Sequence, residues 1–94
     1  MNGDDKLHAA ITSGARAEAT LRDEGLRQAF AALEANYIRL WAQSEPENIE
    51  GRERLWISLQ GLADLQRHLK NMIANGKLAQ AEVDRMMILP RRRA

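Results

Sequence analysis

The clearest pattern in the sequence is a heptad-like stripe of apolar residues between residues 26 and 41. Its members recur at intervals of four and three residues, as in an α-helix that buries one face. They are Leu26, Phe30, Leu33, Tyr37 and Leu40, and Ala29 and Trp41 widen the stripe. We expect this helix to end near Gln43, because Ser44-Glu45-Pro46-Glu47-Asn48 is typical of a turn and proline disfavours helical geometry in the residue before it.

A second apolar stripe predicts a long helix from about Glu50 to Ala74. It consists of Leu55, Leu59, Leu62, Leu65 or Gln66, Leu69, Met72 and Ile73, with Trp56 at its edge. Asn75-Gly76 predicts the end of this helix, since glycine suits the left-handed conformation that often follows a helix. A last short helix is expected over Leu78–Met87, before Pro90. Two long helices joined by a short loop favour an antiparallel hairpin.

The N-terminal part gives a weaker pattern. Residues 1–5 are polar and expected to be frayed, and residues 6–22 are compatible with a helix that starts afresh at Ser13. Asp23 is a further candidate N-cap, and the pattern leaves open whether the chain bends there or continues as one helix. We therefore predict an all-α single domain over residues 1–94. It is an antiparallel helical hairpin with a shorter N-terminal helix, a short C-terminal helix and a basic tail at 88–94.

The predicted hairpin has a thin core. We expect that core to consist of Phe30, Leu33, Tyr37, Trp41, Trp56, Leu59, Leu62 and Leu69. The remaining apolar surface favours self-association or docking on a larger partner, because a small single core gives little stability. The alternative is that the terminal helices fold back and complete a monomeric bundle. Gly61, in the middle of the long helix, either permits a close helix–helix approach or is a tolerated defect.

Composition narrows the classes of protein that remain. The 94 residues include 14 basic and 13 acidic side chains, with no cysteine, which excludes disulfides and thiolate chemistry. Neither a membrane span nor a signal peptide is recognisable. The last seven residues hold three of the basic side chains and no acidic one. A mildly acidic body, at −2 over residues 1–87, is therefore followed by a tribasic tail.

No catalytic, metal-binding or cofactor-binding constellation is recognisable, and we expect neither an enzyme nor a cofactor. His8 and His68 have no metal-ligand spacing around them and are interpreted as surface residues. The carboxylates of Glu45, Glu47, Glu50 and Glu53 flank a turn and a helix start. Stabilisation of the helix start, through the helix dipole and the Glu50–Arg54 pair, explains these carboxylates more simply than acid–base catalysis does.

Several runs resemble a group of small helical proteins encoded by tailed bacteriophages and prophages. They are Arg16-Ala17-Glu18, Leu21-Arg22-Asp23-Glu24, Ala29-Phe30, Leu33-Glu34, Tyr37-Ile38 and Trp41, followed by Glu50-Gly51-Arg52-Glu53-Arg54-Leu55-Trp56, Leu69 and Asn75-Gly76-Lys77-Leu78-Ala79. The similarity covers roughly residues 14–83. It implies a phage setting and a non-enzymatic role, and it supplies no catalytic residues.

The leading hypothesis is a phage structural or assembly accessory protein that binds itself or a larger virion component, located in the host cytoplasm and the virion. The expected partner-binding residues are Met86, Met87, Ile88, Arg91, Arg92 and Arg93. One alternative is a nucleic-acid-associated packaging or regulatory factor that uses the basic tail. Another is a phage inhibitor of a host protein.

Overall fold

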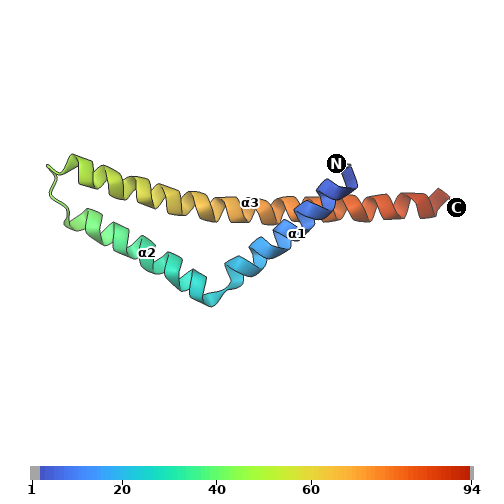
Figure 1. Ribbon diagram of the computed structural model, residues 1–94, viewed down its shortest axis with the longest axis horizontal. Coiled ribbons are helices and arrows are strands. Elements are labelled where there is room, and N and C mark those ends of the chain that lie inside the picture. The colour runs from blue at the N-terminus through green and yellow to red at the C-terminus, as the bar shows by residue number, and fades with distance from the viewer. Residues whose placement is uncertain (1–2, 94) are drawn as a thin grey trace. The chain divides into compact units, whose positions relative to one another are not determined.

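The protein is all-α in the computed structural model, which describes residues 3–93 of the chain and the side chains of residues 3–88. Its helices are α1 (Gly3–Arg22), α2 (Glu24–Gln43) and α3 (Ile49–Arg93) (Figure 1). They form two compact units. The first combines α1 up to Thr20 with α3 from His68 onward, and the second spans Leu21–Arg67. The all-α prediction is confirmed.

Helix caps explain where α2 and α3 begin. The carboxylate of Asp23 accepts a hydrogen bond from the Leu26 backbone N–H at 2.8 Å, which satisfies one of the free donors of the first turn of α2. Asn48 has the same role for α3, since its side-chain oxygen accepts from the Gly51 N–H at 3.0 Å. The chain therefore breaks at Asp23, which decides the alternative left open by the sequence. The restart at Ser13 does not occur, because α1 is continuous through that residue.

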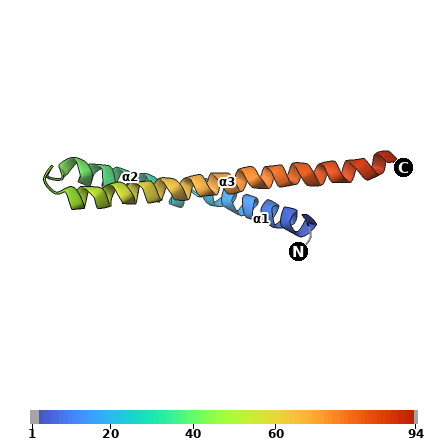
Figure 2. The ribbon, with the colours of Figure 1, turned by 90° about the horizontal axis from the view of Figure 1, so that it is seen from above.

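A backbone-to-backbone contact between α1 and α3 organises the first unit. A methyl group added to Gly14 would lie 2.8 Å from the Met72 carbonyl oxygen and 2.9 Å from the Gly76 Cα. A methyl group on Gly76 would lie 3.0 Å from the Gly14 Cα. Ala17 and Ala79, 2% and 6% exposed, extend the contact. Small residues on both helices thus let their backbones meet where α1 crosses α3 (Figures 1 and 2).

In the second unit, α2 and the first part of α3 run antiparallel on either side of the turn at residues 44–48 (Figure 1). The Ser44 N–H and hydroxyl both donate to the Trp41 carbonyl oxygen, at 3.1 and 2.6 Å, and so close the last turn of α2. The predicted end of α2 at Gln43 is confirmed. Phe30, at 8% exposed, is the buried residue of α2.

The prediction of a separate short C-terminal helix is wrong, because α3 runs without interruption from Ile49 to Arg93. Gly76 has no left-handed backbone conformation. Its missing side chain makes room for α1 instead, and the surrounding alanine, leucine and glutamine residues favour helix. Pro90 does not end the helix either; it removes one backbone hydrogen-bond donor. The helix also includes Gly3–Asp5, part of the segment expected to be frayed, whereas residues 1–2 lie outside the described residues.

Substituting alanine at the glycines of the helices should separate packing from propensity. Gly14→Ala and Gly76→Ala should each lower the free energy of unfolding by about 1–3 kcal/mol, because the new methyl group meets backbone that cannot move aside. Gly61→Ala is the matched control. Its methyl group would meet no atom within 4 Å, so it should raise that free energy by about 0.5–1 kcal/mol. Urea denaturation followed by circular dichroism measures all three, and equal effects would contradict the close contact.

The cap of α2 can be tested at one residue. Asp23→Ala should lower the free energy of unfolding by about 1 kcal/mol, because the Leu26 N–H loses its acceptor. Asp23→Asn keeps an oxygen at the same place and should retain most of the stability. If thermal melting shows the same loss for both substitutions, the hydrogen bond of the cap is not what stabilises the start of α2.

Candidate protein-docking groove

An apolar groove lies where the second unit makes its turn. It is lined by residues from the end of α2, the turn and the first three turns of α3, which are Ile38, Trp41, Pro46, Ile49, Arg52, Glu53, Trp56 and Leu59. Its volume is about 660 Å³, within the range of ligand and peptide sites. We call it the tip groove. Its walls belong to two helices that a short turn connects, so the residues that line the groove lie close together in the sequence.

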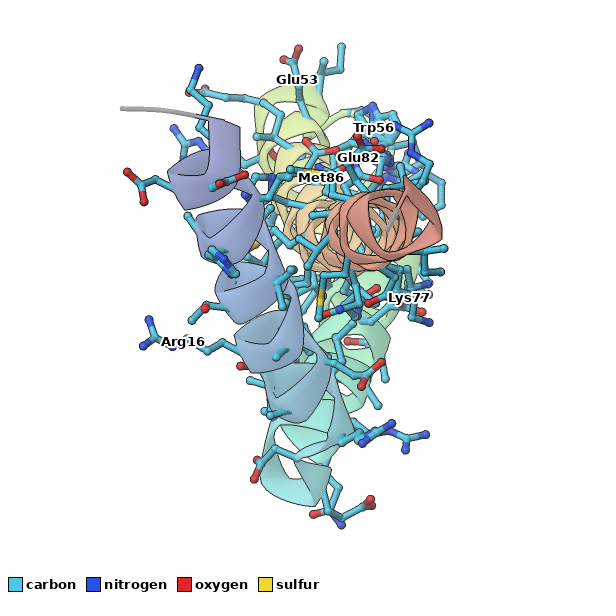
Figure 3. All side chains as sticks on the ribbon, turned by 90° about the vertical axis from the view of Figure 1, so that its right-hand side faces the viewer. Arg16, Glu53, Trp56, Lys77, Glu82 and Met86 are labelled. Carbon is cyan, nitrogen blue, oxygen red and sulfur yellow. The ribbon has the colours of Figure 1, made fainter. Side chains whose placement is uncertain are left out.

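The side chains of the tip groove are unusually accessible for their type. Trp41 is 43% exposed, Trp56 is 51% exposed and Ile49 is 73% exposed. Figure 3 shows Trp56 projecting from α3 on the same side as Glu53. Exposed tryptophans that line one groove form the kind of surface at which binding energy concentrates in protein interfaces.

Arg52 links the two walls of the tip groove. Its guanidinium carbon lies 4.0 Å from the centre of the Trp41 ring, which is a cation–π contact between α3 and α2. Arg52 is half-buried, whereas most of its neighbours in the first turn of α3 are exposed. Even with this contact, Trp41 remains 43% exposed.

Charged side chains of both signs lie in and near the tip groove. Glu53 lines the tip groove, and Pro46 is flanked in the turn by Glu45 and Glu47. Glu50 pairs with Arg54 at 2.7 Å, which confirms the expected i,i+4 pair. Residues 44–54 contain four carboxylates and two guanidinium groups, and the charged residues that line the groove itself are Arg52 and Glu53.

The residues expected in the hairpin core differ in their burial. Phe30 is buried, and four others are half-buried: Tyr37, Leu59, Leu62 and Leu69. Leu33, Trp41 and Trp56 are instead between 43% and 51% exposed. Sequence reasoning did not select Ile38, Ile49 and Arg52 as members of a groove. The turn at residues 44–48 could have indicated them, because it brings the end of the apolar face of α2 next to the start of the apolar face of α3.

The expected partner-binding residues lie near the end of α3. Met86, Met87 and Ile88 are 40%, 54% and 48% exposed, whereas the side chains of Arg91, Arg92 and Arg93 lie outside the described residues. Figure 3 shows Glu82 and Met86 on one side of α3 and Lys77 on the other. Arg85 is already paired with Glu82, whose hydrogen bond and charge raise the pKa of the Arg85 guanidinium.

Other features of the described residues suggest no second site. A depression of about 160 Å³ beside the α1–α3 contact includes Gly14 and Gly76 and follows from their close packing. His8 and His68 are exposed, and among the described residues no group of three metal-ligating side chains comes together. In the part of the chain that the structure describes, no helix is both long and apolar enough to cross a membrane.

The chain matches no protein-family model, and no curated protein or solved structure is significantly similar to it. The assignment of the tip groove therefore rests on its own geometry and chemistry.

Replacing two aromatic residues should distinguish core from groove. Phe30→Ala should lower the free energy of unfolding by about 3 kcal/mol, since it empties a buried position. Trp56→Ala should lower it by about 1 kcal/mol or less, because half of that side chain already faces solvent. Denaturant titrations at low protein concentration measure both. An equal loss for the two would place Trp56 in the core and remove it from the groove.

Proposed function

We propose that this chain is a non-enzymatic structural or assembly accessory protein of a tailed phage, and that it binds a protein partner through the tip groove. The observation that carries the proposal is that Trp41 and Trp56 both line the tip groove and are 43% and 51% exposed. Burying these two rings against a partner would remove a large apolar area from water, which is the main favourable contribution to most protein association.

The balance of buried and exposed apolar residues supports a partner. Among the described residues, the buried apolar side chains are Ala17, Phe30 and Ala79. Twelve large apolar residues are exposed: Leu33, Ile38, Leu40, Trp41, Ile49, Trp56, Ile57, Leu65, Leu78, Met86, Met87 and Ile88. Small cores of this kind are commonly completed by association, and clustered exposed apolar residues commonly mark interaction surfaces.

The alternative of a self-contained monomeric bundle has less support. It requires the terminal helices to cover the apolar ends of the hairpin, yet Trp41 and Trp56 keep about half of their surface in solvent. The contact that α1 does make uses Gly14 and Ala17, so its small-residue face is already occupied by α3.

The phage setting rests on the sequence resemblance alone. It implies that the partner is a virion component, an assembly intermediate or a second copy of the chain. Mass spectrometry of purified virions and of particles arrested during assembly examines this setting. Absence of the protein from both would remove the phage-assembly part of the proposal.

Site-specific photo-crosslinking tests binding through the tip groove. A benzophenone amino acid at position 56 should form a covalent adduct with a protein in the cells that encode the chain, because Trp56 lines the groove and is 51% exposed. The matched control carries the same group at Arg16, which is exposed on α1 and points away from α3 (Figure 3). We expect the adduct yield from position 56 to be at least about tenfold higher than from position 16. This ratio corresponds to a difference of about 1.4 kcal/mol in binding free energy between docking at the groove and docking at α1. Equal adduct yields would contradict the proposal.

A further inference from the structure

We infer that the tip groove binds the tip groove of a second copy of this chain, with the first turns of the two α3 helices antiparallel. The inference rests on the proposed function, since it names the partner of the same groove. It uses residues of the second unit only, and it follows from a symmetry in the residues that α3 contributes to the groove.

These residues form a symmetrical pattern along one face of α3. Successive members are three, one and three residues apart, which places all of them on one side of a helix. They are Ile49, Arg52, Glu53 and Trp56. In both directions along the chain, the face runs from an apolar residue through two opposite charges to an apolar residue. A two-fold axis between positions 52 and 53 of two antiparallel helices therefore places Arg52 of each copy opposite Glu53 of the other. The same axis places Ile49 of each copy opposite Trp56 of the other.

Charge complementarity favours this arrangement. Within the part of the chain that the structure describes, Glu53 takes part in no ion pair, and the Arg52 guanidinium is stacked on Trp41. A stacked guanidinium keeps N–H groups at its edge, where a carboxylate can accept two parallel hydrogen bonds. The two-fold pairing makes this contact twice. A parallel pairing in register would instead place arginine against arginine and glutamate against glutamate, and a strongly basic or acidic partner would meet one like charge.

The apolar surface of the tip groove is large enough for such a contact. Trp41 and Trp56 are 43% and 51% exposed, so the two side chains leave on the order of 200 Å² open in each copy. Ile38 and Ile49, at 51% and 73% exposed, add a comparable area. Two grooves face to face would bury roughly 800 Å² of apolar surface. Since little more than half of a typical interface is apolar, the whole contact would be about 1,400 Å², which lies within the range of specific, stable interfaces.

Reversing the charges at the centre of the face tests the pairing in the full-length chain. Arg52→Glu makes both central residues of each copy acidic, and Glu53→Arg makes both of them basic. Each variant should self-associate at least about tenfold more weakly than the natural chain, because like charges then face one another. Sedimentation equilibrium measures the association, and circular dichroism checks that the helices are intact. An equal mixture of the two variants should associate at close to natural strength, since each acidic face then meets a basic one.

Further variants separate the pairing from local damage to the groove. A double variant with Arg52→Glu and Glu53→Arg exchanges the two charges within one chain. Its association should recover, because opposite charges face one another again although the stack on Trp41 is lost. Arg54→Glu and Glu50→Arg are the matched controls, since they make the same changes in net charge at exposed positions that do not line the groove. Each control should associate within about twofold of the natural chain.

Tryptophan fluorescence locates the contact. Both tryptophans of the chain, Trp41 and Trp56, line the tip groove, so their emission reports on this surface. On dilution of the natural chain, the emission maximum should move to longer wavelength as the rings become exposed to water. The midpoint concentration of this shift should equal that of the dissociation measured by sedimentation. Association with unchanged emission would place the contact elsewhere and overturn the inference.

Three other results would also overturn it. They are a natural chain that remains monomeric, whether its groove stays open or is covered by another part of the same chain, unchanged association in the single variants, and a mixture that associates no better than its components. The proposed function fails separately, through equal crosslinking from positions 56 and 16. A crosslink from position 56 to a different protein, together with a monomeric chain, keeps the docking groove and gives it another occupant.

Discussion

The packing of the first unit depends on the contact between the Gly14 and Gly76 backbones. Two helices ordinarily pack with their axes 8–10 Å apart, held off by side chains. Here a single carbon on either glycine would already meet backbone atoms of the other helix. The buried apolar side chains of this unit, among the described residues, are those of Ala17 and Ala79, and each contributes little apolar area. The stability of the unit depends on shape and close dispersion contacts more than on a large hydrophobic area.

The second unit follows a different principle. Its two helices are joined by a short turn whose polar groups are satisfied by Ser44 and Asn48, so the turn determines how the helices start relative to one another. Trp41 and Trp56, the tryptophans nearest that turn, lie where α2 and α3 do not cover them completely. Arg52 stacks on one of them, and Glu53 lines the same groove. The surface that remains combines the chemistry of a core with the accessibility of a binding site.

The sequence predicted the helical class, the end of α2 and the pair of Glu50 with Arg54, because these depend on spacing over a few residues. It failed at Gly76 and left two alternatives open at Gly61, because a glycine in a helical pattern has several uses. Only the neighbouring helix shows which one applies: Gly76 meets the backbone of α1, and Gly61 meets open space. It also could not tell which aromatic residues of a stripe are covered. Periodicity predicts a face, but burial depends on how far the partner helix reaches along that face, as the contrast between Phe30 and Trp56 illustrates.

The helical conformation of Asn75-Gly76 has a chemical consequence. In a flexible chain, an asparagine before glycine is prone to deamidation, because the unhindered glycine nitrogen attacks the asparagine side-chain carbonyl carbon and closes a succinimide ring with release of ammonia. Inside α3 the backbone cannot readily adopt the geometry for that attack, and Gly76 is held against α1. Asn75-Gly76, a sequence typical of helix ends, is thereby protected from deamidation for as long as α1 and α3 stay in contact. Loss of the close contact would expose Asn75 to conversion into aspartate and isoaspartate, so the covalent integrity of the chain is coupled to its fold.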